Sequence, residues 1–596
     1  MKKNFIFTIY AIALAVFFIL SGAFLVGTPN APETYWLSSV KQTEEGEIEN
    51  SGFTLELDVD YTVKGEDGEE ETAKHDICKA YAYIGKVYSF NSDGKVDIVL
   101  DFKTKSSGET SYNERVRAVI SKSYSWVEIY DGKISGNRRV KIHSPQSFEL
   151  CEVAFLAEDG SLLKVDKLVS QSEGTKSSAS FVFDEQGSFN PSSAYAYNLS
   201  DKEREELISA DDLFNGGETL GSAPLTTALN GLAVLIFGRN PFAIRFFSLL
   251  AGYASLILAF LILKRLFDSD TLSLFGSLFI LFACSLFSGA VTATTAVSVP
   301  FILSAYYLAI GFYAELYRFD YKSATYKNLL FTGLFVGLAV SCGASNIVSL
   351  AGVPVIWGIS LFKLSKDYKK EYESAKGLDK ETVYYAYNGK TATYAYLMPI
   401  SFVVIPVLVA LLTYAINYNA VSKGGGFFAG VISNVVGSFK TERNISALGV
   451  LIGYGSETVG SGYKAFNYIP FILFALGFAF TTFFAVAGKT EKFGKIWRGI
   501  KNKYILTTII AVSVYIPLAV GINLSVGGTA LFSCAYSIYA VMALSALKKS
   551  LGKKVFNAVS ITLISICFVT FIGLCFGIFG LEISEGLKNA LYAWQL

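Results

Sequence analysis

Long apolar runs recur along this chain, and charged residues are divided unequally between the segments that separate them. Residues 28–222 contain 36 Asp and Glu against 20 Lys and Arg, whereas the rest of the chain contains 14 acids against 31 bases. With 596 residues and 52% apolar composition, the chain has room for many membrane spans and one sizeable soluble block. The pattern predicts a polytopic α-helical membrane protein with an acidic domain inserted after its first helix.

Apolar segments long enough to cross about 30 Å of hydrocarbon mark the predicted spans. The first covers residues 4–27, after Lys2 and Lys3, and we interpret it as an uncleaved helix, with a cleaved signal peptide as the alternative. Ten further segments bring the predicted number of spans to about 11, at residues 242–263, 271–289, 294–316, 328–345, 346–362, 396–416, 466–488, 504–523, 527–546 and 556–580.

Basic residues gather in alternate loops, among them residues 264–265 and 364–395. Because basic loops stay in the cytoplasm, we expect a multi-pass protein of the cell membrane with a cytoplasmic N-terminus and an extracytoplasmic C-terminus. Residues 28–222 and 417–464 are then extracytoplasmic. The loops alternate consistently between the two sides of the membrane only if the apolar segment 224–237 does not span it. This segment is too short to span comfortably and is expected to lie along the membrane face.

Alternating apolar and polar residues dominate the inserted block and predict about eight short strands. The clearest alternation covers residues 53–59, 95–102 and 126–130. Asp-Gly pairs, which favour tight turns, occur at residues 67–68, 93–94, 131–132 and 159–160. The block is therefore predicted to be an extracytoplasmic all-β jelly roll or sandwich. Its two cysteines, Cys78 and Cys151, form either a disulfide or two buried free thiols, and the sequence leaves both open.

Changes in composition divide the chain into six segments. Residues 1–36 hold the first helix and the start of the outer loop, 37–199 the β block, and 200–240 two juxtamembrane helices, expected at 201–213 and 224–237. Residues 241–363 form a membrane core, 364–395 a cytoplasmic loop, and 396–596 the C-terminal helices with the outer loop 417–464.

Three stretches near the juxtamembrane helices carry a family resemblance: Leu207–Ala210, Ala223–Leu225 and Ile236–Phe246. Together with Gly333–Ala339, they resemble the C-type glycosyltransferases that use polyprenyl-phosphate sugars, above all the protein O-mannosyltransferase and aminoarabinose-transferase group. The resemblance implies transfer of a hexosyl or pentosyl unit from a lipid phosphate at the outer membrane face. Separately, Phe148–Leu156 resembles the closing strands of discoidin-type, galactose-binding-like jelly rolls.

Members of the glycosyltransferase group place an Asp-Glu pair just after the first helix, where the Asp is taken as the general base. In this chain Glu33 matches the second acid and Pro32 stands in place of the first, so the resemblance makes Glu33 the principal catalytic candidate. Asp211, Asp212 and Glu218 are secondary acid candidates, although we expect each to lie on a solvated helix face or cap.

Two further positions depart from the family pattern. No acid occurs in residues 294–300, and Ala223 replaces the family's His or Lys. The candidate cations for the donor lipid phosphate are Arg245, at the start of a span, and Lys440 and Arg443, in the long outer loop. The sequence leaves two alternatives open: Arg245 snorkels or pairs with an acid, and Lys440 and Arg443 are surface charges.

Several classes of function are disfavoured. Acids are nearly absent from the predicted spans, which argues against a proton-coupled transporter. The sequence contains no phosphate loop, dinucleotide fingerprint or Cys/His metal cluster, so we expect neither a metal nor a cofactor. The expected partners are membrane lipid, a lipid-linked sugar donor and a glycan or protein acceptor, but no nucleic acid. The alternative is a catalytically degenerate member that acts as an outer-face glycan-binding or assembly protein.

Overall fold

The computed structural model describes residues 36–171 with short gaps, 201–215, 223–282, 297–316, 323–421, 426–439, 468–488 and 491–519, with isolated residues near 8–12 and 531–565. The chain divides into two compact units. The β unit comprises Gly27–Ile208 and Phe237–Pro241, and the helical unit comprises Met1–Val26, Ser209–Ile236 and Phe242–Leu596.

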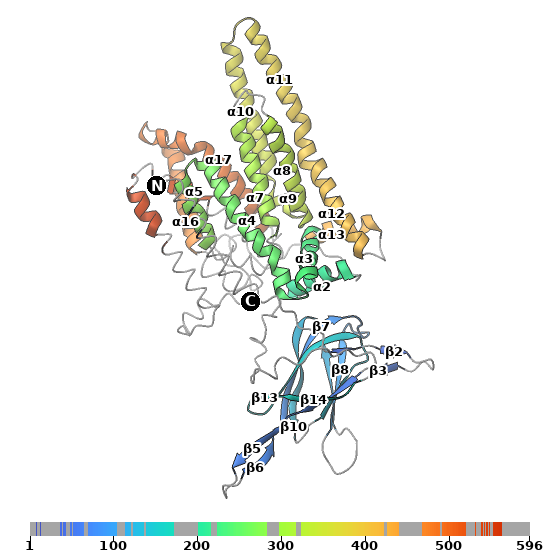
Figure 1. Cartoon of the computed structure of the whole chain (residues 1–596). Helices are drawn as coiled ribbons and strands as arrows, with labels where there is room; N and C mark the ends of the chain where they lie inside the picture. Colours follow the sequence, from blue (N-terminus) through green and yellow to red (C-terminus); the bar gives the residue numbers. More distant parts are fainter. Residues whose placement is uncertain are drawn as a thin grey trace. The chain divides into compact units, whose positions relative to one another are not determined.

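Two five-stranded sheets with antiparallel strand pairs build the β unit (Figure 1). The first sheet contains β1 (Trp36–Leu37), β12 (Phe148–Leu156), β7 (Ile77–Val87) and β10 (Ser125–Ile134) in that order, with β13 (Leu162–Leu163) paired to β12. The second contains β14 (Val165–Gln171), β4 (Gly52–Leu57), β11 (Arg139–His143), β8 (Val96–Lys103) and β9 (Glu114–Ile120) in that order. Two hairpins stand outside the sheets: β2 (Val40–Gln42) with β3 (Ile48–Asn50), and β5 (Asp60–Lys64) with β6 (Glu70–Lys74).

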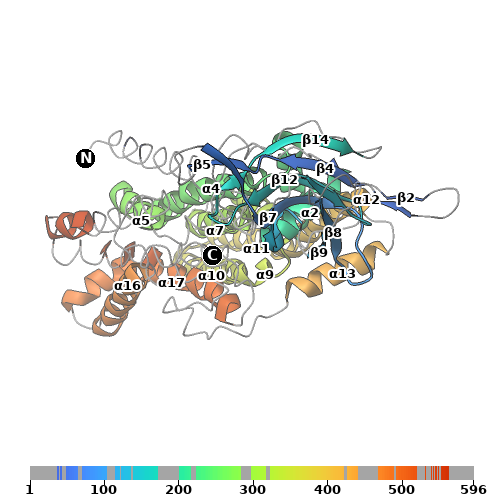
Figure 2. The same cartoon turned by 90° about the horizontal axis from the view of Figure 1, so that it is seen from below.

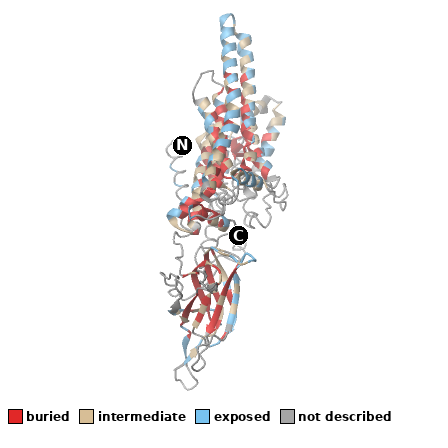
Figure 3. Cartoon of the chain, turned by 90° about the vertical axis from the view of Figure 1, so that its right-hand side faces the viewer, coloured by how far each residue is buried: buried red, intermediate tan, exposed pale blue. Residues whose placement is uncertain are grey.

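One apolar core fills the space between the two sheets, as the buried residues in Figure 3 show. Trp36 lies at its centre, with its ring 4.9 Å from Phe53 of the opposite sheet and 5.6 Å from Phe148 of its own. Inward residues of both sheets belong to this single cluster, as in a sandwich. The predicted all-β sandwich is therefore confirmed, while its likeness to discoidin-type jelly rolls stays a prediction.

The Asp-Gly turns are confirmed in part. Gly94 and Gly160 adopt φ values of 71° and 80°, in the left-handed region that glycine favours. The turn predicted at Asp131-Gly132 is wrong, because both residues lie within β10 at a register shift against β7. A Cβ atom at Gly132 would lie 2.5 Å from the Tyr130 hydroxyl oxygen, so here glycine makes room for a folded-back ring. The fourth pair, at 67–68, lies outside the described residues.

Both cysteines of the β unit are free thiols. Cys78 lies near the start of β7, whereas Cys151 lies on β12 between the partners of Ile84 and Tyr83. About five residues of strand, roughly 17 Å, therefore separate them along the sheet. A disulfide needs Cα atoms less than about 7 Å apart, so this register rules one out.

The helical unit contains the following helices in chain order: the second half of α2 (Asp201–Asn215), α3 (Pro224–Phe237), α4 (Pro241–Phe267), α5 (Asp270–Phe282), α7 (Ser298–Glu315), α8 (Ser323–Ser341), α9 (Asn346–Ser349), α10 (Gly352–Ser374), α11 (Leu378–Pro399), the π-helix η3 (Ile400–Val404), α12 (Ile405–Val421), α13 (Phe427–Ser438), α16 (Tyr468–Ala487) and α17 (Glu491–Ala519).

Among the described residues, three helices are long and apolar enough to cross a membrane: Phe242–Phe267, Asn346–Ser374 and Leu378–Tyr418. Shorter apolar helices include α3, which has the length predicted for a non-spanning segment. The chain is thus a multi-pass helical membrane protein. Its first predicted span and most of the last two lie outside the described residues, so the number of 11 spans and their orientation stay predictions.

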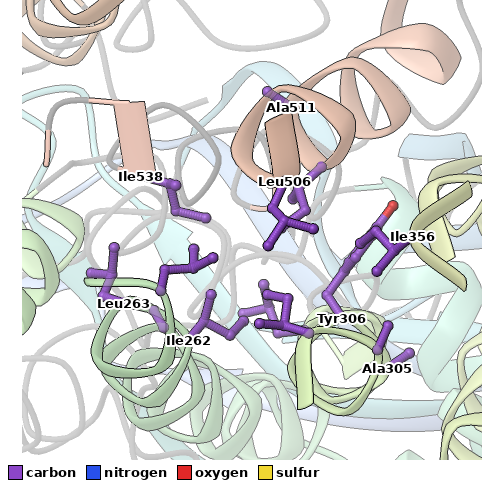
Figure 4. Close-up of a cluster of buried hydrophobic side chains, with 14 of the residues drawn as sticks. Ile262, Leu263, Ala305, Tyr306, Ile356, Leu506, Ala511 and Ile538 are labelled. Carbon is purple, nitrogen blue, oxygen red and sulfur yellow. The ribbon is translucent and has the colours of Figure 1, made fainter. Parts of the chain in front are cut away.

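Apolar side chains from α4, α7, α10 and α17 form the core of the helical unit (Figure 4). Glycines allow helices to approach closely beside it. A Cβ atom at Gly333 on α8 would lie 2.3 Å from the Ser401 carbonyl oxygen of η3, and one at Gly337 would lie 2.7 Å from Val409 Cβ of α12. These glycines, which carried part of the family resemblance, therefore serve the packing of α8 on α12.

The segment 364–395 is not an open loop. α10 and α11 run through it as an antiparallel pair that extends beyond the neighbouring helices in Figure 1. Gly377, with φ of 60°, makes the turn, and the rings of Tyr368 and Tyr387 stack at 4.0 Å across the pair. At another side of the unit, α16 and α17 lie side by side, as Figure 2 shows from below.

Candidate active site

The second half of α2 packs against α3 through a glycine. A Cβ atom at Gly231 would lie 2.5 Å from the Phe214 ring and 3.0 Å from the Ala210 carbonyl oxygen. No other residue fits between these helices without a shift, because one of the contacts is backbone. This close approach fixes α2 over α3, and with it the two acids that follow Ala210.

Asp211 and Asp212 are both buried, with 1% and 5% of their surface exposed. The expectation of a solvated helix face is therefore wrong. The side-chain amide of Asn215, one turn further along α2, donates a hydrogen bond to Asp211 Oδ1 at 2.6 Å. Sequence could not show this burial, because it depends on how α2 packs in the fold.

The first turn of α3 is tied to the last turns of α12. Asn417 Nδ2 donates to the Pro224 carbonyl oxygen at 2.7 Å, across 193 residues of chain. Asn417 is buried, with 1% of its surface exposed. The contact brings the juxtamembrane helices and the helix that follows η3 to one place.

Four buried polar groups collect around this contact: the hydroxyls of Thr226, Thr227 and Tyr414, and Asn417 Oδ1. None of them has a hydrogen-bond partner within the described part of the chain. Buried polar atoms are normally hydrogen-bonded, so these four groups are candidates to bind a ligand or water. We call Thr226, Thr227, Tyr414 and Asn417 the polar cluster. The sequence signal for the polar cluster is the pair of threonines directly after Ala223-Pro224-Leu225. The residues predicted from the sequence do not include it.

Of the remaining predicted residues, the structure describes only Arg245. Arg245 is half-buried in the first turn of α4, and nothing tests its proposed contact with a phosphate. Glu33, Glu218, Lys440 and Arg443 lie outside the described residues. Within the described residues, no three His, Cys, Asp or Glu side chains are placed to hold a metal ion.

The β unit holds its buried charges in pairs. Arg117 Nε lies 3.0 Å from Asp97, and Arg115 Nε lies 2.6 Å from Asp101, which also meets His143 Nε2 at 2.9 Å. The hydrogen bond from Arg117 holds the pKa of Asp97 below its ordinary value, against the effect of burial. Burial would raise the pKa of Asp101, but the hydrogen bonds from Arg115 and His143 outweigh it and keep that pKa low. Burial lowers the pKa of His143.

These pairs lie on β8, β9 and β11, which are neighbouring strands of one sheet. Each of these acids already has a cation beside it, which is typical of a structural ion pair and not of a catalytic base. The polar cluster and the buried acids of α2 are therefore the candidate active site.

Comparison with known proteins bears on this same region. Residues 179–422 match the family model described as dolichyl-phosphate-mannose-protein mannosyltransferase. The match runs from before α2 to the end of α12 and confirms the resemblance to C-type glycosyltransferases. No curated protein matches the chain.

Solved structures similar to the chain include two membrane enzymes. The crystal structure of ArnT from Cupriavidus metallidurans bound to undecaprenyl phosphate has a TM-score of 0.40 and 13% identity, over 66% of this chain and 70% of that one. The archaeal oligosaccharyltransferase AglB from Archaeoglobus fulgidus, in complex with an inhibitory peptide and a dolichol-phosphate, has a TM-score of 0.37 and 12% identity, over 67% of this chain and 56% of that one.

Proposed function

We propose that the chain is a membrane glycosyltransferase that moves a hexosyl or pentosyl unit from a polyprenyl-phosphate carrier to a glycan or protein acceptor at the outer membrane face. The observation that carries the proposal is the match of residues 179–422, whose description names a lipid-phosphate sugar donor and a protein acceptor. That range includes α2, α3 and α12, which supply the buried acids and the polar cluster.

The reaction asks little covalent chemistry of the protein. A carboxylate removes the proton of the acceptor hydroxyl, whose oxygen bonds to the anomeric carbon as the bond to the phosphate oxygen breaks. The polyprenyl phosphate leaves with that electron pair, and a cation stabilises its charge. We assign the base to Glu33 first and to Asp211 or Asp212 next, and the cation to Arg245, with Lys440 and Arg443 as further candidates.

The polar cluster suits the sugar. Its hydroxyl and amide groups donate and accept hydrogen bonds without a charge, as the hydroxyls of a pyranose do. The β unit would then bind glycan or position the acceptor. Neither a metal nor a cofactor takes part in this scheme.

A degenerate member of the family is the alternative, and a specific observation favours it. Pro32, Ala223 and the acid-free residues 294–300 replace three features of the family pattern. Such a chain would act as an outer-face glycan-binding or assembly protein.

The test uses the full chain in vesicles, supplied with polyprenyl-phosphate-linked sugars and peptide or glycan acceptors. Glu33→Gln keeps the size of the side chain but removes its proton acceptance, so we expect transfer to fall by roughly 10²–10⁴-fold. Asp211→Asn and Asp212→Asn identify the base if Glu33→Gln is fully active. Asp379→Asn, at an exposed position on α11, is the matched control.

Two results count against the proposal. Full activity in all three variants would mean that none of these acids is the base. Absence of transfer by the unaltered chain across the donor panel would favour the degenerate alternative, for which glycan binding is then the readout.

A further inference from the structure

The loop that joins β7 to β8, residues 88–95, presents two aromatic rings to solvent. Tyr88 is 50% exposed and Phe90 is 53% exposed. The loop holds them there, because the backbone amides of Tyr88 and Ser89 both donate to the Ser147 carbonyl oxygen, at 2.8 and 3.1 Å. The Ser147 amide in turn donates to Ser89 Oγ at 2.7 Å. Two exposed aromatic rings therefore lie on one short loop whose backbone is held at residues 88 and 89.

The same end of the β unit carries an ion pair that involves the chain next to α4. Tyr88 donates its hydroxyl proton to Glu149 Oε1 at 2.6 Å, and Arg239 Nη1 lies 2.8 Å from the same oxygen. Glu149 is buried, with 7% of its surface exposed. Arg239 lies three residues before Phe242, the first residue of a candidate membrane span. Arg239 therefore stands within about 11 Å of the start of that span, whatever the arrangement of the two units.

A second covalent connection reaches the same place. β1 pairs with β12 so that Leu37 lies opposite Glu149. Leu37 follows the predicted first span, residues 4–27, by ten residues of chain. Two of the three covalent connections between the β unit and the helical unit, those through residues 27 and 237–241, thus arrive at Glu149, beside Tyr88, while the third passes through α2. The connection at Arg239 is the shorter of the two and keeps this end of the β unit near the start of a candidate span.

We propose that loop 88–95 rests on the membrane, with the rings of Tyr88 and Phe90 in the interfacial layer of the bilayer. A tyrosine ring with its hydroxyl directed to Glu149 has the apolar body and polar tip that suit this layer. Lys86 Nζ lies 5.8 Å from the centre of the Tyr88 ring and adds a cation at the level of lipid phosphates. The contact would fix the tilt of the β unit relative to the membrane and does not depend on whether the chain is catalytic.

The test places a fluorophore at Phe90→Cys in the full chain and reconstitutes it in phosphatidylcholine vesicles with a nitroxide on the acyl chain. Fluorescence from the unaltered chain, treated with the same thiol reagent, is subtracted to remove its native cysteines. We expect the label at position 90 to lose most of its emission to the nitroxide lipid and little to iodide in the water.

Tyr61→Cys is the matched control. Tyr61 is 40% exposed and stacks on His75, just before β7 begins at Ile77. It therefore lies at the opposite end of β7, whose 11 residues extend roughly 35 Å. Its label should respond to iodide and not to the nitroxide lipid.

Equal quenching by iodide at both positions would overturn the proposal. Protection of position 90 from both quenchers would overturn it as well, because a protein or glycan partner would then cover the loop. Phe90 is exposed and outside the core, so Phe90→Cys should leave the melting temperature of the chain unchanged.

Discussion

The β unit and the helical unit bury polar side chains in different ways. In the β unit, buried carboxylates reach cations on other segments, as Asp97 does with Arg117 and Glu149 with Arg239. In the helices, buried hydroxyls donate to a carbonyl four residues earlier in the same helix, at distances of 2.7, 2.8 and 2.7 Å for Ser255, Ser341 and Ser360. These carboxylates are held by contacts between elements, whereas these hydroxyls are satisfied within a single helix.

The difference follows from the two solvents. A strand beside water can hold a charged pair, because the cation stays partly hydrated while the acid is covered. A helix in hydrocarbon has no such help and must satisfy its groups internally. The hydroxyls of Thr226, Thr227 and Tyr414, and Asn417 Oδ1, show neither pattern. They gather around the hydrogen bond between residues 417 and 224, which is why we take the polar cluster as the site.

The largest expected effect concerns the side of the membrane on which each unit lies. A position is either labelled from outside the cell or it is not. Tyr61→Cys lies in the β unit, and Leu378→Cys lies at the tip of the α10–α11 pair, where Leu378 is 83% exposed. With an impermeant thiol reagent, we expect position 61 to be labelled from outside the cell and position 378 only after permeabilisation. Labelling of both from the same side would refute the predicted topology.

Close helix packing should give the next largest effect. Gly333→Ala places a methyl group 2.3 Å from the Ser401 carbonyl oxygen, so we expect a loss of about 1–3 kcal/mol in the free energy of unfolding. Gly358→Ala, on the α10 face where a methyl group meets nothing within 4 Å, is the control and should be neutral or stabilising by up to about 1 kcal/mol. Thermal melting of the two variants in detergent, followed by helical circular dichroism, compares them. Equal melting would contradict the close contact of α8 with η3.

Acid should weaken the β unit before the helices. The pKa values of Asp97 and Asp101 are lowered in the fold, so their contribution is present above the unfolded pKa and is lost as pH falls through the folded pKa. The lowered pKa of His143 acts in the same direction, because the unfolded chain takes up its proton first. Since both arginines are largely exposed, the effect is screened and smaller than a packing defect.

The measurement is the melting temperature of the strand signal as pH is lowered from neutrality to about 3. Asp97→Asn should flatten the response. A β unit whose melting temperature rises on acidification would contradict the assigned pKa directions.

The smallest effect should come from a hydroxyl that is satisfied within its own helix. Ser360→Ala removes the bond to the Ile356 carbonyl oxygen, at a cost of about 0.6 kcal/mol or less. Thr226→Ala, in the polar cluster, should likewise leave the melting temperature nearly unchanged but raise the KM for the sugar donor. An equal KM in both variants would remove the polar cluster from the site.

Local patterns were sufficient where a segment determines its own structure. Phe148–Leu156, which resembles a closing strand of a jelly roll, forms β12, and Pro224–Phe237 forms α3 at the bounds that its Pro and the following Gly predict. The prediction of a loop at 364–395 rested on its many charges and is wrong, because α10 and α11 run through this segment. Its Leu364, Tyr368 and Tyr387 follow a helical spacing that buries or stacks them along the α10–α11 pair.

Features that depend on distant contacts could not be read in this way. The burial of Asp211 depends on how α2 packs in the fold, and the polar cluster requires a hydrogen bond between residues 224 and 417. Asp131-Gly132 has the composition of a turn, but pairing with β7 overrides that preference. Pattern therefore predicts the elements, and the site arises only from how they are packed.

The helix Leu378–Tyr418 is 41 residues long, or roughly 60 Å at 1.5 Å per residue. Hydrocarbon covers only about 30 Å of it, so its first half forms a rigid stalk in water together with the end of α10. The stalk keeps bulky neighbours at a distance in a crowded membrane. In electron cryomicroscopy it would project from the detergent belt and act as a fiducial for the orientation of each particle.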